Sequence, residues 1–155
     1  MNRRQFLPMI AAPVFAPWRS DAKDLDWPQW HGPNRDNVSA ETGLMNSWPR
    51  GGPKVVWASA GLGNGYGTVA VADDRIYVQG TRGRDSALWC LNRADGKQIW
   101  NAPLGKRLDQ DRGPGPRGTP TVDGDRVYAL TENGDLACIR VKDANGIWHK
   151  NILQD

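Results

Sequence analysis

The stretch Gly67-Thr-Val-Ala-Val-Ala-Asp-Asp-Arg-Ile-Tyr-Val78 is copied by Gly118-Thr-Pro-Thr-Val-Asp-Gly-Asp-Arg-Val-Tyr-Ala129. The two copies share Gly, Thr, Val, Asp, Arg and Tyr at matching places. A repeat of about 40 to 50 residues that is built from short strands is typical of radial or stacked all-β arrays, in which one unit cannot bury its own apolar face. The repeat therefore indicates the fold class of the chain more directly than any single motif does.

The copying continues beyond this stretch. Cys90 is followed ten residues later by Trp100, and Cys138 is followed ten residues later by Trp148. In the first unit we expect four strands, at about 67–71, 75–79, 87–92 and 98–102, because these ranges are rich in Val, Ile, Tyr and Trp and are separated by turn residues. Turn signals of the Asp-Gly and Asn-Gly type stand between the last two strands of each unit.

The composition argues against helices. The chain of 155 residues has 18 glycines and 11 prolines, and no long window shows the apolar period of a helix. We therefore predict an all-β fold made of two four-stranded antiparallel units. A β-propeller fits a fixed repeat of this kind better than a sandwich, whose strands do not recur at a constant period.

The run from Cys90 to Gly105 resembles the tryptophan-docking repeat of the pyrroloquinoline quinone (PQQ)-like propellers. Gly96, Lys97, Trp100 and Gly105 match the pattern of that repeat. The second unit keeps Trp148, with Gly146 shifted by two places. The resemblance implies that Trp100 and Trp148 are structural residues, each packed between neighbouring blades.

The lead-in from Trp27 to Asp36 is also similar to the opening of exported bacterial PQQ-like propeller proteins. We expect an irregular lead-in rich in Trp, Pro and Gly over 17–53, followed over 54–155 by part of a propeller. That part would hold a lone outer strand at 54–60, a blade at about 66–105 and a blade at about 117–153. A closed ring needs at least four blades, so we expect this chain to be the N-terminal fragment of a larger propeller, whose missing blades would complete the ring. Assembly of several copies of this chain is the alternative.

The N-terminus carries paired arginines, Arg3 and Arg4, before a short apolar run. This pattern predicts a signal peptide over 1–16, of the twin-arginine or the general secretory type, and therefore a periplasmic or otherwise exported protein. The apolar run is too short for a stable membrane span. Its removal would lower the net charge from +3 to +1 (3 − 2), and the remaining basic residues form no extended run, so we expect no nucleic-acid partner.

Few residues suggest chemistry. Cys90 and Cys138 take equivalent places in the two units and are expected to be buried free thiols rather than a disulfide. Tyr66 and Arg117 precede the innermost strands and are weak candidates for cofactor binding, because an Arg fork and an aromatic ring suit a ligand with carboxylates. The alternative is that they pack and pair within the protein. The tryptophans of the lead-in are expected to pack over the propeller, with carbohydrate stacking as the alternative.

We find no catalytic residues and no metal site in the sequence, since His31 and His149 lack neighbours at metal-ligand spacing. The resemblance implies a non-catalytic binding or scaffold module, similar in architecture to the propeller lipoprotein that assists outer-membrane protein assembly. Its partner would be another protein. The alternative is the front part of a quinoprotein dehydrogenase that oxidises an alcohol or sugar with PQQ and calcium; otherwise no cofactor is expected.

Overall fold

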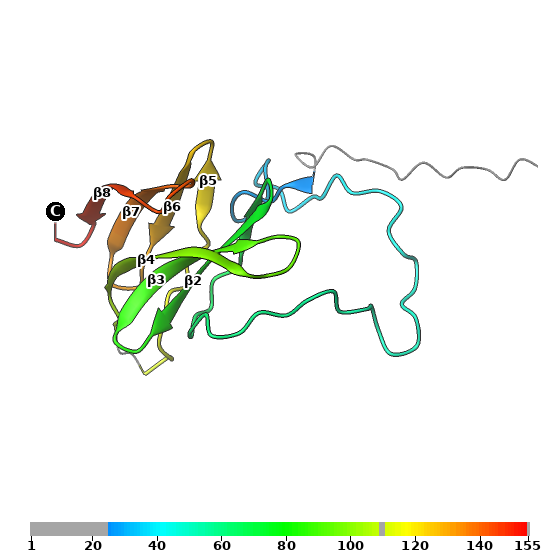
Figure 1. The fold of residues 1–155 in the computed structure, drawn as a ribbon, viewed down its shortest axis with the longest axis horizontal. Helices are drawn as coiled ribbons and strands as arrows, with labels where there is room; N and C mark the ends of the chain where they lie inside the picture. The colour runs from blue at the N-terminus through cyan, green and yellow to red at the C-terminus, as the bar shows by residue number, and fades with distance from the viewer. Residues whose placement is uncertain (1–24, 109–110, 155) are drawn as a thin grey trace, which may run out of the picture.

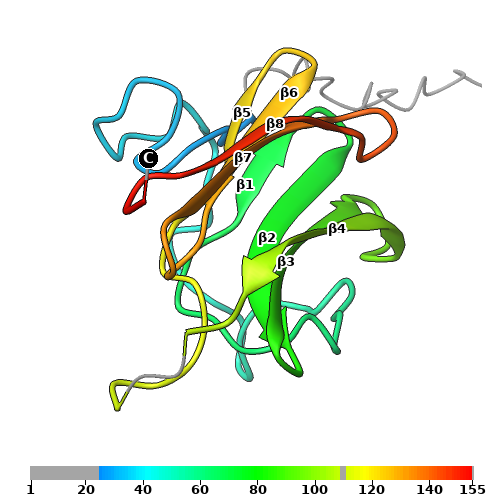
Figure 2. The same cartoon turned by 90° about the vertical axis from the view of Figure 1, so that its left-hand side faces the viewer.

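The computed structural model describes residues 25–108 and 111–154, and the described residues form two four-stranded antiparallel sheets (Figures 1 and 2). The first sheet has the strand order β1-β2-β3-β4 and the second has the order β5-β6-β7-β8. The strands are β1 Ala70–Ala72, β2 Arg75–Arg82, β3 Asp85–Asn92, β4 Gln98–Lys106, β5 Thr121–Asp123, β6 Arg126–Leu130, β7 Asp135–Arg140 and β8 Gly146–Asn151. The predicted all-β fold with two four-stranded units is confirmed, although β2, β3 and β4 are longer than expected.

The two sheets repeat each other in register as well as in order. Tyr77 pairs with Ala70 in the first sheet, and its counterpart Tyr128 pairs with Thr121 in the second. The first hairpin of each sheet turns through a residue with positive φ, Asp73 at 52° and Gly124 at 56°. The copied sequence therefore specifies the copied backbone, because the turn chemistry fixes the register of each hairpin.

The core lies between the sheets. One apolar cluster takes Tyr77, Leu88 and Cys90 from the first sheet together with Val127 and Ile139 from the second. All five are almost fully buried. Burial of apolar surface stabilises the fold by roughly 25 cal/mol per Å². Because the two sheets bury their apolar faces against each other, neither sheet buries its own face alone.

The lead-in pairs with the edge strand of each sheet, β1 and β5. Trp27 pairs with Val71 through two backbone hydrogen bonds of 2.8 and 2.9 Å, and Pro28 accepts a hydrogen bond of 2.8 Å from the amide of Val122. In Figure 1 this blue segment lies beside β1. It therefore covers the free edge of β1, the strand that lies innermost in a propeller blade, and reaches the neighbouring strand β5.

The structure assigns no strand to 54–60, where we expected a lone outer strand. A strand needs a neighbour for its backbone donors and acceptors, and the ladders and bridges of the described residues do not include this segment.

The lead-in packs less than we expected: Trp48, which we expected to pack over the propeller, is 67% exposed. Within the described residues no helix is long and apolar enough to cross a membrane. The predicted signal peptide over 1–16 and Trp18 lie outside the described residues.

Candidate functional site

The contact between the two sheets depends on Trp100, which projects from β4 toward the second sheet. Its indole nitrogen donates a hydrogen bond of 2.9 Å to the carbonyl oxygen of Val141. Arg75 on β2 donates a second hydrogen bond, of 2.5 Å, to the same oxygen. One backbone carbonyl of the second blade is thus held by two side chains of the first blade.

A β-bulge aims this tryptophan. Cys90 pairs with Trp100 and the next residue, Leu91, pairs with Gln98, so Ile99 is left without an opposite residue. The second sheet has the same irregularity at Ile147, beside Trp148. A bulge increases the local twist and re-aims the neighbouring side chain. The repeated bulge therefore gives each docking tryptophan its direction.

Trp57 makes the same contact with the first sheet, a role that we did not predict from the sequence. Its indole nitrogen donates a hydrogen bond of 3.0 Å to the carbonyl oxygen of Arg93, the repeat counterpart of Val141. The ring also lies directly against Gly96, where an added Cβ would overlap it. The signal was present, because an apolar residue precedes each docking tryptophan, as in Val56-Trp57, Ile99-Trp100 and Ile147-Trp148.

The outer face of the second sheet carries the same donors. The ring centroid of Trp148 lies 6.1 Å from that of Tyr128, as Trp100 lies 5.9 Å from Tyr77. Trp148 is 41% exposed, and the side chain of Arg126, the counterpart of Arg75, is half exposed. We call Trp148 and Arg126 the outer donor pair. In the first blade the equivalent pair meets a backbone carbonyl, so the outer donor pair has the geometry of a docking surface.

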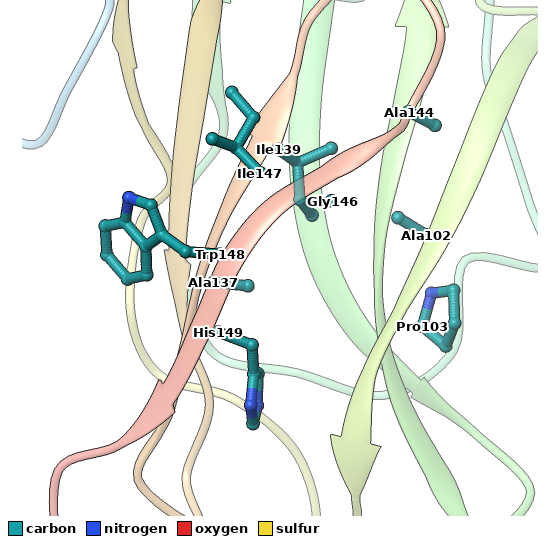
Figure 3. Close-up of a pocket in the computed structure, with 9 residues that line it drawn as sticks. All are labelled: Ala102, Pro103, Ala137, Ile139, Ala144, Gly146, Ile147, Trp148 and His149. Atoms are coloured by element: carbon teal, nitrogen blue, oxygen red, sulfur yellow. The ribbon is translucent and has the colours of Figure 1, made fainter.

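A groove of about 410 Å³ separates β4 from β8 (Figure 3). Its lining includes Ala102 and Pro103 on the side of β4, and Gly146, Ile147 and Trp148 on the side of β8. In Figure 3 the indole of Trp148 lies across β8 from Ala102 and Pro103. His149 lines the groove, and its Nε2 atom is 3.3 Å from the Asp135 carboxylate.

Tyr66 and Arg117, the candidates for cofactor binding, lie together. The guanidinium carbon of Arg117 is 5.2 Å from the centroid of the Tyr66 ring. Arg117 also donates hydrogen bonds of 3.3 to 3.4 Å to carbonyl oxygens of its own loop, at Arg112, Gly113 and Gly115. The structure thus brings the two residues together, with the Arg117 donors directed at the loop.

The remaining chemical candidates are structural in this geometry. Cys90 and Cys138 are free and buried, as expected. Burial raises the pKa of the Cys90 thiol to about 11, despite the nearby Arg75 guanidinium, which acts in the opposite direction. A neutral buried thiol is a poor nucleophile. In the described ranges, 25–108 and 111–154, no group of three or more His, Cys, Asp or Glu residues is arranged to hold a metal ion.

Comparison with known proteins identifies the family. Residues 18–155 match the PQQ_2 family model, which is described as outer membrane protein assembly factor BamB. No curated protein matches the chain. Among solved structures, a quinohemoprotein alcohol dehydrogenase from Pseudomonas putida HK5 matches with 24% identity and a TM-score of 0.48, over 66% of this chain and 15% of that chain. This chain thus corresponds to a small part of that protein. Because the family model covers residues 18–155, the chain belongs to the BamB-type family of PQQ-repeat β-propellers.

Proposed function

We propose that this chain is part of an exported PQQ-like propeller that acts as a non-catalytic binding or scaffold module. The observation that carries the proposal is the use of the Arg117 donors. The guanidinium stacks on Tyr66 and bonds to carbonyl oxygens of its own loop. A cofactor with carboxylates would have to displace these contacts, so the pair is better suited to holding the loop than to holding a quinone.

The outer donor pair supports docking, either of a further blade or of a protein partner, because its counterparts Trp100 and Arg75 contact the neighbouring blade. Trp and Arg are the residue types most enriched among the energetic hot spots of protein interfaces. Trp148 offers an indole N–H and an apolar ring at the surface. Arg126, whose Nε atom lies 3.7 Å from the Asp125 carboxylate, adds a planar group of N–H donors beside it. The family description names an assembly factor, which is consistent with a protein partner for this propeller.

A titration tests the proposal against the alternative, a PQQ- and calcium-dependent alcohol or sugar dehydrogenase. The full-length protein would be mixed with PQQ and Ca²⁺, and the absorbance of the quinone would be followed in the protein fraction after gel filtration. We expect the quinone to elute separately from the protein. Co-elution of one equivalent of quinone, lost in an Arg117→Met variant, would refute the non-catalytic proposal in favour of the dehydrogenase.

Cross-linking tests the docking surface itself. A photoreactive amino acid would replace Trp148 in the full-length protein, and a matched variant would carry it at Trp48, which is 67% exposed in the lead-in. We expect position 148 to form a cross-link, to the next blade of the same polypeptide where the propeller continues or to a second polypeptide where it does not, and position 48 to form none. A cross-link from position 148 to the same chain alone would remove this surface from the proposed partner contact.

Export can be tested separately. Replacement of Arg3 and Arg4 by lysine keeps the charge of the N-terminus while it removes the paired arginines. We expect the double variant to remain inside the cell and the parent protein to reach the periplasm, as measured by fractionation and immunoblotting. Equal export of both proteins would exclude the twin-arginine route and leave the general secretory route.

A further inference from the structure

Another hollow lies at the opposite edge of the first sheet from β4, between the lead-in and β1. Its volume is about 510 Å³, and its lining includes Trp27, Trp30, His31, Asn37, Glu41 and Thr68. The lead-in forms one wall and the inner edge of the first sheet forms the other. We call this hollow the lead-in pocket.

The two tryptophans of the lead-in pocket differ in role. Trp27 is fixed, because its backbone pairs with Val71 and its ring lies against Gly32, where an added Cβ would stand 2.8 Å from the ring. Trp30 is 64% exposed, and its ring centroid lies 4.1 Å from that of His31 at an interplanar angle of 58°. Trp27 therefore anchors the wall, whereas Trp30 presents an open aromatic face at the pocket.

The backbone around the polar lining is held in an uncommon conformation. His31 and Asn37 have φ angles of 68° and 61°, in the left-handed region, which His and Asn adopt more often than most residues with a Cβ. The amide of Asn37 donates a hydrogen bond of 3.0 Å to the carbonyl oxygen of His31 and joins the two positions. Residues in such conformations persist only where the surrounding structure holds them, and they cluster at ligand sites. Two of them line this one pocket.

The other polar groups come from both walls. Glu41 and Ser39 line the pocket from the lead-in, and the amide of Glu41 is held by the Ser39 hydroxyl at 3.2 Å. The hydroxyl of Thr68 lies 2.7 Å from the hydroxyl of Thr119, its repeat counterpart in the second blade. The pocket thus offers hydroxyl, amide, imidazole and carboxylate groups beside an exposed indole.

We propose that the lead-in pocket binds a neutral carbohydrate. The face of an indole packs well against the C–H face of a pyranose ring, and the surrounding acceptors and donors suit its hydroxyl groups. Among the described residues that line the pocket, Glu41 carries a charge and none is Lys or Arg. An acidic saccharide would meet that carboxylate without a compensating cation, so the lining selects a neutral ligand. This inference does not depend on the proposed scaffold function.

Tryptophan fluorescence of the full-length protein tests the proposal. The protein would be titrated with cellohexaose, maltohexaose and mannohexaose as neutral probes, and with an acidic hexamer of galacturonic acid. We expect a saturable change with at least one neutral probe and at least a tenfold weaker response to the acidic probe. Calorimetry with the responding probe would give the stoichiometry, expected to be one site per chain.

Matched variants locate the site. Trp30→Ala removes the exposed ring of the pocket, and Trp48→Ala removes a ring of similar exposure (67%) in the same lead-in but outside the pocket. We expect Trp30→Ala to weaken binding at least tenfold and Trp48→Ala to leave it unchanged, with far-UV circular dichroism identical in both. Absence of saturable binding to any neutral probe, an equal loss in the two variants, or equal affinity for the acidic probe would each overturn the proposal.

Discussion

Because two side chains donate to one carbonyl between the blades, we expect the effects of removing them on the free energy of unfolding to be coupled. The Val141 carbonyl oxygen accepts hydrogen bonds from Trp100 Nε1 and from the Arg75 guanidinium. A Trp100→Phe variant keeps an aromatic ring and leaves the carbonyl with the Arg75 donor. An Arg75→Met variant keeps much of the side-chain stem and leaves the carbonyl with the indole. Each single change should cost about 1 to 2 kcal/mol of unfolding free energy, since a hydrogen bond contributes about 1 kcal/mol net and somewhat more when it is charge-assisted.

The double variant should lose more than the sum of the two single losses. Without either donor, the partly buried carbonyl has no partner among these side chains, and an unsatisfied group of this kind costs about 1 to 3 kcal/mol. We therefore expect a coupling energy of about 1 to 2 kcal/mol. Urea denaturation of the full-length protein and of the three variants, monitored by fluorescence and circular dichroism with equal m-values, would measure it.

A second cycle provides the control. Arg140 lies in the second blade, and its guanidinium is paired with Asp143 at 3.1 Å rather than with the Val141 carbonyl. The combination of Trp100→Phe with Arg140→Met should therefore be additive to within about 0.5 kcal/mol. Additive losses for Trp100 and Arg75 as well would refute the shared-carbonyl clamp. The two side chains would then contribute to stability independently.

Two further predictions concern the repeat itself. Gly96 (φ 70°) and its counterpart Ala144 (φ 62°) occupy the same turn position. Gly96→Ala should lower the free energy of unfolding by at least about 2 kcal/mol, because the new methyl group overlaps Trp57 and the alanine would have to adopt a left-handed φ. Ala144→Gly should leave the free energy of unfolding unchanged or raise it by up to about 1 kcal/mol, as measured by urea titration of both variants. Equal losses in the two would contradict this reasoning. Cys90 should resist maleimide at pH 8 until urea unfolds the protein, since burial raises its pKa from 9.0 to about 11. The stability from its neutral form should be complete below pH 9 and should fall as the pH rises toward 11; rapid labelling of the native protein would show that the thiol is accessible.

The strands and hairpins were predictable because their signals are local. The matching Asp-Arg-x-Tyr segments and their turn residues fix both the register and the order of strands within each sheet. The turn before β4 could not be predicted from the local sequence alone. The glycine that ends this turn in the first blade, Gly96, is replaced by Ala144 in the second, and Ala144 still adopts a positive φ. The sequence suggested a glycine shifted to position 146, whereas the backbone kept the original place.

The candidate sites were harder to predict because they depend on contacts between distant segments. Tyr66 and Arg117 could be named from their equivalent places before the innermost strands, but the engagement of the Arg117 donors by its own loop is a property of the folded loop. Trp30 and Trp48 are indistinguishable by composition and exposure. Only the position of the lead-in against β1 separates a pocket-lining tryptophan from one that lines no pocket.

Trp57 shows how docking and strand pairing are separable in this fold. Trp100 belongs to the fourth strand of a complete sheet, whereas Trp57 lies in a segment that forms no ladder. Both nevertheless donate to the equivalent carbonyl of the next blade, at 2.9 and 3.0 Å. The contact therefore requires an indole N–H, a carbonyl at the end of the third strand and a tight turn at positive φ, and it does not require backbone pairing of the donor segment. The outer donor pair carries the first of these features already, so any segment that presents a carbonyl beside such a turn has the chemistry to dock there.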